Sequence, residues 1–230
     1  MSLAMEITYE IDGLQFTNFT EDDITQQETI ADDLCLRHLP HYEINLPHLR
    51  SQFSPASEID EALLDQCINL IESNIGDLYA RHKGANWKEE KLEEMSEPGL
   101  IVLWFTDPAA DDDDDLAGFI SFKLCLDDDD IFVLYLFEIH LAARYQGRKL
   151  GQMLIDQFHQ FVEVGLQRSE NALYRMVRGT SLTVFSDNTR ALSWYKSMGY
   201  GLIDSSPRDR TLRSGKIVKP EYYLMRRDLE

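Results

Sequence analysis

Residues 132–152 read Phe-Val-Leu-Tyr-Leu-Phe-Glu-Ile-His-Leu-Ala-Ala-Arg-Tyr-Gln-Gly-Arg-Lys-Leu-Gly-Gln, and this stretch decides the fold. Its first half is mostly apolar and rich in β-branched and aromatic residues, which predicts a buried strand over 131–141. Its second half ends in glycine and basic residues. Apolar residues then recur at four-residue steps from Leu150 to Val162, which predicts a helix over 150–166.

A strand that leads through a glycine-containing turn into a helix directs several backbone N–H groups at one point. Such a point binds anions, and it suits a pyrophosphate. The acid inside the predicted strand is Glu138. A carboxylate in a buried strand needs either a partner or a chemical role.

At 230 residues the chain can form one large α/β domain or, at the limit, two small ones, and 43% apolar residues are enough for a core. No run approaches 18 apolar residues and no signal pattern opens the chain, so we expect an unsecreted protein without a membrane segment. Cys35, Cys67 and Cys125 match no zinc spacing. We therefore predict no metal site and three buried thiols of a reducing compartment.

The net charge is −19, and two aspartate runs, 111–115 and 127–130, supply nine of the negative charges. Without those nine the charge would still be −10, so the acidity is general. A protein of this charge should repel nucleic acid and attract basic peptides, although solubility alone also explains it. The run at 111–115 is expected to be a loop, and the run at 127–130 is either a solvated turn or a site for a basic residue.

The remaining pattern predicts a mixed α/β sheet with no internal repeat. In chain order we expect a hairpin turn at Asp12 and Gly13, a helix over 28–39, a strand over 42–46, helices over 58–84 and 87–95, strands over 100–105 and 116–126, then the central strand and helix, a strand over 181–185, a helix over 188–198 closed by Gly199, and strands over 200–203 and 222–225.

Two motifs resemble those of the GNAT acetyltransferases. Gln146-Gly-Arg-Lys-Leu-Gly151 resembles the Gln/Arg-x-x-Gly-x-Gly pyrophosphate loop, and Asn188 to Tyr195, with Met198-Gly-Tyr200 beyond it, resembles the Asn-x-x-Ala-x-x-x-Tyr helix. The two stand in the right order, each after a strand. The resemblance implies a single GNAT fold over 42–230 with an N-terminal extension over 1–41.

Other stretches are similar to the NatD branch of this superfamily, which acetylates histone N-termini. They are Leu78-Tyr79, Trp87 to Met95, Leu134 to Glu138, Leu182 to Phe185, Asp204 to Pro207 and Tyr222 to Arg227. The resemblance implies acetyl transfer from acetyl-CoA to a free α-amine by direct attack in a ternary complex. It implies the basic Ser-Gly-Arg-Gly tail of histones of the four and two-A types as substrate, no auxiliary subunit, and a location in cytoplasm and nucleus.

The same resemblance implies roles for single residues. The catalytic residue would be Glu138, near the attacking amine. The residues facing acetyl-CoA would be Ile139, His140 and Leu141 on the pantetheine arm, Gly147, Arg148, Lys149, Leu150, Gly151 and Gln152 on the pyrophosphate, and Thr183, Asn188 and Tyr195. The peptide would meet Tyr79, Asp127, Phe137, Ser205 and Tyr222.

Two residues depart from the family pattern. Lys149 stands where the loop usually has its middle glycine, so its backbone must keep a negative φ or accept strain. The charge of Lys149 could instead give it a role, in contact with a phosphate. Phe137 stands where some relatives have tyrosine, which removes a hydroxyl.

Structural alternatives stay open for several of these residues. Glu138 could be a structural acid paired with His140 or an arginine. Tyr79 could merely end a helix stripe, and His140 could be a core residue. Tyr195 could be a core aromatic or the acid that protonates the leaving thiolate.

The chemistry of amide formation does not require a strong base. An α-amine has a pKa of about 7.7–8.0, so deprotonating it at pH 7 costs only about 1–1.4 kcal/mol. Alignment of amine and thioester can contribute about 7–11 kcal/mol, so the strand geometry should matter more than any one acid. Two other functions stay open: a GNAT enzyme acting on lysine or a small amine, and a non-catalytic acidic histone-binding module.

Overall fold

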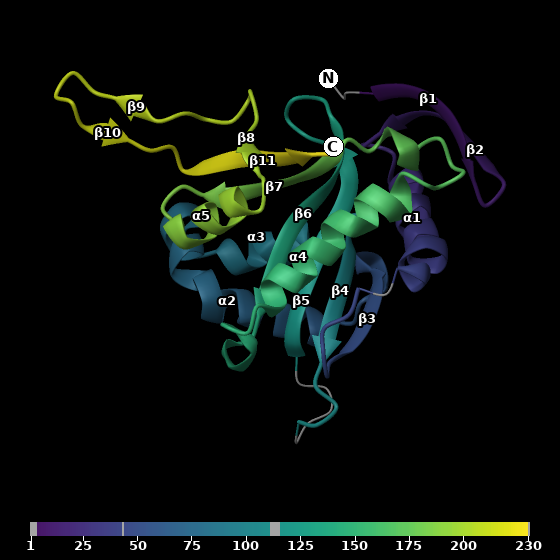
Figure 1. The fold of residues 1–230 in the computed structure, drawn as a ribbon, viewed down its shortest axis with the longest axis horizontal. Helices are drawn as coiled ribbons and strands as arrows, with labels where there is room; N and C mark the ends of the chain where they lie inside the picture. Colours follow the sequence, from purple (N-terminus) through teal and green to yellow (C-terminus); the bar gives the residue numbers. More distant parts are fainter. Residues whose placement is uncertain (1–3, 43, 111–115, 230) are drawn as a thin grey trace.

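The computed structural model describes residues 4–42, 44–110 and 116–229 (Figure 1). Within these residues, a seven-stranded sheet runs in the order β3-β4-β5-β6-β7-β11-β8. The pair β6–β7 is parallel and the other neighbours are antiparallel. A parallel pair needs a crossover, which α4 supplies between β6 and β7. The predicted mixed sheet with flanking helices is confirmed.

Most elements lie where the periodicity predicts them. The strands of the sheet are β3 (Arg50–Pro55), β4 (Ile101–Thr106), β5 (Leu116–Leu126), β6 (Phe132–Leu141), β7 (Gly179–Phe185), β8 (Gly201–Leu202) and β11 (Tyr222–Asp228). The helices are α1 (Ile24–Asp33), α2 (Glu61–Lys83), α3 (Trp87–Glu94), α4 (Leu150–Gln160) and α5 (Thr189–Ser197). Two hairpins stand outside the sheet, β1 (Ala4–Ile11) with β2 (Leu14–Thr20), and β9 (Arg210–Thr211) with β10 (Ile217–Val218).

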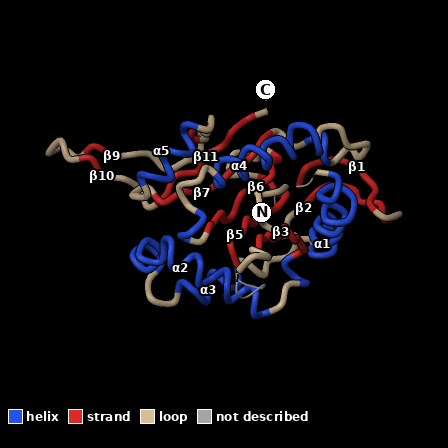
Figure 2. Tube along the Cα trace, turned by 60° about the horizontal axis from the view of Figure 1, so that its bottom comes forward, coloured by secondary structure: helices blue, strands red, loops and turns tan. Residues whose placement is uncertain are grey.

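The helices form two layers, one on each face of the sheet (Figure 2). Helices α2 and α3 cover one face, and their core includes Cys67, Ile71 and Trp87. Helix α4 crosses the other face, where its predicted apolar stripe places Leu154 and Phe158 in the larger core. Because each face is closed by helices, a polar residue of the central strands must have a partner or lie in an opening between layers.

Residues 4–41 pack against the rest of the chain. The predicted hairpin turn is confirmed, since Asp12 and Gly13 join β1 to β2 with positive φ values of 52° and 77°. The ring of Phe19 packs edge-on against Phe132 of β6 with the centroids 4.8 Å apart. The hairpin and α1 therefore share the larger core with the sheet, and a domain boundary at residue 41 stays a prediction.

The strand predicted over 42–46 is wrong. Ile44 and Leu46 are buried, but residues 44–46 form no strand, and the sheet begins at β3 instead. The amide of Gln157 on α4 bonds both the N–H and the C=O of Asn45, at 2.7 and 2.9 Å. The side-chain amide thus forms the hydrogen bonds to the N–H and C=O of Asn45 that a neighbouring strand would otherwise form. Between β8 and β11 the chain forms the β9–β10 hairpin. The aspartate run at 111–115, predicted as a loop, lies outside the described residues.

Candidate active site

A cleft of about 1170 Å³ opens where β6 and β7 part. The two strands pair only from Leu134 to Leu136 on β6 and from Thr180 to Leu182 on β7. Beyond that point β6 continues to Leu141 beside β5 alone. The β7-side edge of residues 137–141 therefore borders the cleft and leaves its backbone groups available to an extended ligand.

A β-bulge turns Glu138 into this cleft. Across β5–β6, Phe122 faces Leu136 and Ser121 faces Glu138, so Phe137 is the extra residue. Before the bulge, Leu134 and Leu136 point into the core beneath α4, and after it Ile139 and Leu141 do so. The bulge thereby moves Glu138 to the face covered by α2 and α3.

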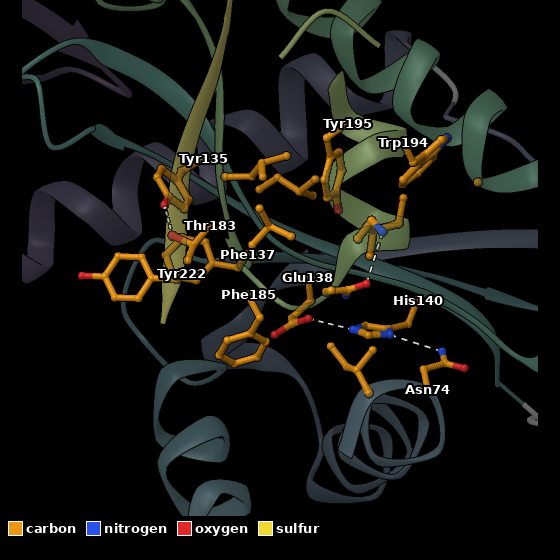
Figure 3. A pocket seen from close by; sticks show the side chains of 18 of the residues that line it. Asn74, Tyr135, Phe137, Glu138, His140, Thr183, Phe185, Trp194, Tyr195 and Tyr222 are labelled. Atoms are coloured by element: carbon orange, nitrogen blue, oxygen red, sulfur yellow. Dashed lines mark hydrogen bonds and ion pairs between the residues drawn. The ribbon is translucent and has the colours of Figure 1, made fainter. Parts of the chain in front are cut away.

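Three donors hold the carboxylate of Glu138, which is only 5% exposed. Its Oε1 accepts from the Tyr79 hydroxyl at 2.5 Å and from Lys91 Nζ at 2.8 Å. Its Oε2 accepts from His140 Nε2 at 2.7 Å (Figure 3). A carboxylate has about four lone-pair sites, so one acceptor site, on Oε2, is left for a substrate or water.

The charges around Glu138 keep it ionised. Burial favours the neutral acid, but the ammonium of Lys91 and the hydrogen bond from His140 lower the pKa of Glu138 well below its usual range. Burial by itself would lower the pKa of Lys91, yet Glu138 and Glu94 raise it above its ordinary value. Burial raises the pKa of Glu94, the second carboxylate on Lys91, despite that ammonium.

The side-chain amides of Asn74 and Gln146 form a hydrogen-bond network on the side of His140 opposite Glu138. Asn74 Nδ2 lies 3.2 Å from His140 Nδ1 and donates to the carbonyl of Leu141 at 3.1 Å. Gln146 donates to that same carbonyl at 2.8 Å and to Asn74 Oδ1 at 2.9 Å. If Nδ1 accepts from Asn74, the ring carries its proton on Nε2 and donates it to Glu138. Helix α2 is kinked at Ile75, next to Asn74, where it faces the cleft.

The other end of the cleft is the N-terminus of α4. No side chain caps this helix, and the first N–H groups of an α-helix have no intrahelical acceptor. Gly147 and Lys149 have positive φ values of 71° and 63°. Lys149 thus accepts the left-handed conformation usually given to glycine, so the strain anticipated for it is present.

Most of the predicted site residues line this one cleft. They are Tyr79, Phe137, Glu138, Ile139, His140, Leu141, Gly147, Lys149, Gly151, Gln152, Thr183, Asn188, Tyr195 and Tyr222. The hydroxyl of Thr183 bonds to that of Tyr135 at 2.6 Å, and Figure 3 shows this pair across the cleft from His140. Arg148 is exposed with its guanidinium 6.0 Å from the Tyr145 ring, and the Leu150 side chain lies in the core, so neither side chain lines the cleft.

Asp127 and Ser205 do not line the cleft, and their predicted contact with substrate stays a prediction. The side chain of Asp127 is fully buried, and its Oδ2 accepts from Arg226 at 2.7 Å and from Ser181 at 3.1 Å. Its Oδ1 accepts two backbone N–H groups of its own turn. Both oxygens are therefore occupied. Ser205 is exposed and donates its N–H to Asp129, while Asp128 is the residue of this turn that lines the cleft.

Three residues of the site, Lys91, Asn74 and Glu94, are not among those predicted from the sequence. A signal for Lys91 was available, since it stands four residues from both Trp87 and Met95, on the buried stripe of α3. A lysine between two buried apolar residues of one helix face must be paired. The chain offers no comparable signal for Asn74, whose place depends on the kink in α2.

Comparisons with known proteins agree with this architecture. The Acetyltransferase (GNAT) family profile matches residues 70–200, more than half of the chain. N-alpha-acetyltransferase 40 of Saccharomyces cerevisiae is 31% identical over 183 residues, which cover 70% of this chain and 61% of the yeast protein. The chain thus spans about three fifths of the length of this relative.

Two solved structures share the fold. An acetyltransferase from Streptococcus agalactiae is 14% identical with a TM-score of 0.51, over 80% of this chain and 100% of that one. The PaiA N-acetyltransferase of Thermoplasma acidophilum, solved in complex with coenzyme A, is 14% identical with a TM-score of 0.50, over 79% of this chain and 99% of that one. Cleft, bulge, helix terminus and profile agree, and the chain belongs to the GNAT acetyltransferase family.

Proposed function

We propose that this protein transfers an acetyl group from acetyl-CoA to the free α-amine of a protein N-terminus. The observation that carries the proposal is the juxtaposition along one cleft of an open strand edge, an uncapped helix N-terminus and an ionised carboxylate, Glu138. The similarity to N-alpha-acetyltransferase 40 supports the α-amine of a protein as acceptor.

The residues at the α4 end fit acetyl-CoA. The N–H groups of Leu150, Gly151 and Gln152 belong to the first helical turn and can bind the two phosphates, with the positive end of the helix dipole behind them. The pantetheine arm carries amides, which suit the open edge of β6 at residues 139–141. When bound, acetyl-CoA supplies an activated acyl group for the amine.

Glu138 suits an α-amine, which costs little to deprotonate at pH 7. Its pKa lies well below its usual range, so it is a weak base, but an amine of pKa about 7.7–8.0 requires no strong one. The remaining acceptor site on Oε2 can orient the amine and receive its proton directly or through water. Placement of the amine beside the cofactor end of the cleft should supply most of the acceleration.

The preferred substrate that we propose is the Ser-Gly-Arg-Gly tail of histones. Besides Glu138, the acids that line the cleft are Glu21, Glu94, Glu97 and Asp128, and the chain carries a net charge of −19, so a basic peptide is favoured. We further propose that the enzyme works without an auxiliary subunit, in cytoplasm and nucleus.

Acetyl transfer to a panel of peptides tests the proposal. Purified protein, acetyl-CoA and peptides with different N-termini are combined, and mass spectrometry locates the acetyl group. We expect α-acetylation, fastest on Ser-Gly-Arg-Gly. An ε-acetyl product would identify a lysine acetyltransferase, and peptide binding without transfer would identify a non-catalytic histone-binding module.

A further inference from the structure

We propose that Lys91 is a positioning residue that holds Glu138 as a fixed carboxylate at the floor of the cleft, so that the incoming amine meets an acceptor and not a protonated acid. The part of this inference that concerns the amine rests on the proposed function. The part that concerns Glu138 rests on the contacts of Lys91 alone.

Lys91 is buried for a structural reason. Trp87 and Lys91 of helix α3 and Met95, which follows it, face the sheet, and all three residues are at most 5% exposed. A buried lysine is tolerated only when its ammonium is paired. Here the three-residue stripe leads the ammonium into the cleft that Glu138 enters from β6.

The contacts of Lys91 leave it no freedom to bind substrate. Its Nζ lies 2.8 Å from Glu138 Oε1 and 2.5 Å from Glu94 Oε1. The same atom lies 4.9 Å from the centroid of the Tyr79 ring, in cation–π contact. Two charge-assisted hydrogen bonds and an aromatic face fix the ammonium in one place. Lys91 therefore acts on the amine through Glu138.

Within the described part of the chain, Glu138 has no second lysine or arginine in contact with it. The groups that face it are Tyr79 from α2, Lys91 from α3 and His140 from its own strand, and Glu94 lies beyond Lys91. Tyr195 from α5 lines the same cleft, and burial, Tyr200 and the charge of Glu138 raise the pKa of its hydroxyl, so it stays neutral. The other lysine buried in the cleft wall, Lys123, is 3.7 Å from Glu97. Without Lys91, the buried carboxylate of Glu138 and the partly exposed carboxylate of Glu94 would share one site with no lysine between them, an arrangement that favours protonation of Glu138.

The first experiment measures kcat against pH from 6 to 9 for the wild type, Lys91→Gln and Lys91→Arg. Glutamine keeps a donor but removes the charge. We expect Lys91→Gln to lose at least about tenfold in kcat at pH 7, with its acid limb displaced to higher pH and partial recovery near pH 9. Lys91→Arg should keep the acid limb of the wild type. A loss of the same size at every pH would overturn the proposal.

A second experiment reads the ionisation of Glu138 without catalysis. In the wild type the lowered pKa of Glu138 contributes stability above its unfolded pKa of about 4.3, and this is lost as pH falls through the folded pKa. In Lys91→Gln the pKa of folded Glu138 should rise above its unfolded value. The folded state of this variant then favours the protonated acid, and its stability increases as pH falls. The urea midpoint of this variant should therefore lie further below the wild-type midpoint at pH 7.5 than at pH 5. Equal deficits at both pH values would contradict the inference.

Two further variants complete the test. Lys88→Gln removes a partly exposed lysine of the same helix, which pairs with Glu72, and should change neither the pH profile nor the midpoint difference. The double variant Lys91→Gln/Glu138→Gln should be more stable than Lys91→Gln, even if the single variant folds poorly, because no unpaired charge stays buried. A double variant no more stable than the single one would overturn the proposal. A wild type without α-acetylation would instead reject the proposed function and leave these stability results interpretable.

Discussion

Glu138 shows how one side chain can be both a structural acid and a candidate catalytic group. The alternative that pairs it with His140 is confirmed, but Lys91 and Tyr79 hold it as well. Because these donors leave one acceptor site on Oε2, pairing does not exclude a chemical role. The carboxylate is fixed by neighbours and can still receive an amine.

Glu138→Gln should lower kcat about 10²-fold, since the amide keeps the shape of the side chain and removes the charge that accepts a proton. Steady-state kinetics with a Ser-Gly-Arg-Gly peptide measures this effect. The peptide KM should change little. If only KM rises, Glu138 is a binding residue and not a base.

Lys149 provides a test of local strain. Its φ of 63° is unfavourable for a residue with a Cβ and costs roughly 1–2 kcal/mol. Lys149→Gly and Lys149→Ala remove the same charge, but only glycine relieves the strain. Urea denaturation should find the glycine variant about 1 kcal/mol more stable than the alanine variant. Equal stability would mean that the turn relaxes around the alanine.

At the scale of elements, the start of α4 should decide cofactor affinity. Gly151→Asp places a carboxylate where the first-turn N–H groups would meet a pyrophosphate. A Cβ at this position would lie 3.7 Å from the Trp194 ring and 3.8 Å from Leu141, which is ordinary contact, so the variant should fold.

Calorimetry should show at least about tenfold weaker acetyl-CoA binding to Gly151→Asp, equivalent to about 1.4 kcal/mol. The control is Gly201→Asp, on β8, where an added Cβ meets no atom within 4 Å. It adds the same charge outside the cleft lining and should leave affinity unchanged. Unchanged affinity in a folded Gly151→Asp protein would refute the assignment of the helix terminus.

Two neighbouring aspartates of the β5–β6 turn lie in different surroundings, Asp127 in the interior and Asp128 in the cleft. Asp127→Asn should lower the free energy of unfolding by about 1.5–3 kcal/mol, because it removes the charge that Arg226 and the turn bind in a fully buried place. Asp128→Asn is the matched control, since Asp128 is exposed and lines the cleft. Denaturation should show little effect of Asp128→Asn on stability. The opposite order would mean that the buried network of Asp127 is dispensable.

At the scale of the whole molecule, general acidity and local pockets should affect peptides differently. The net charge of −19 attracts any basic tail, mainly raises the association rate, and is screened at physiological salt, where the Debye length is about 8 Å. Exposed pairs contribute only about 0–1 kcal/mol each. Selectivity should therefore come from partly buried contacts at the first residues of the peptide.

Replacing the third-position arginine of a Ser-Gly-Arg-Gly-Lys peptide by alanine should therefore cost more in kcat/KM than removing the later lysine. Asp128→Asn, which changes an acid of the cleft, should reduce this preference, while Asp127→Asn should not. Kinetics at low and moderate salt decides the matter. Equal sensitivity to every basic residue, abolished by salt, would show diffuse attraction alone.

The sequence by itself determined most of the order of elements, including β6 and α4, and the position of the uncapped terminus of α4. These are local properties. Apolar periodicity specified β6 and α4, and Gly199, with a φ of 91°, follows α5 as its position in the motif predicts. The glycine-containing loop identified the uncapped helix terminus because such a terminus is built from consecutive residues.

Only the tertiary structure decided which way Glu138 faces and what holds it. Strict alternation along β6 would place Glu138 with Leu134 and Leu136 in the core beneath α4, and the bulge at Phe137 reverses that. The bulge depends on the register against β5, which adjacent residues do not encode. Lys91 reaches Glu138 from a position 47 residues earlier in the numbering, and Asp127 turns inward to Arg226, 99 residues later. Pairings of this kind arise from the packing of elements, so a local pattern reveals the charge and not its partner.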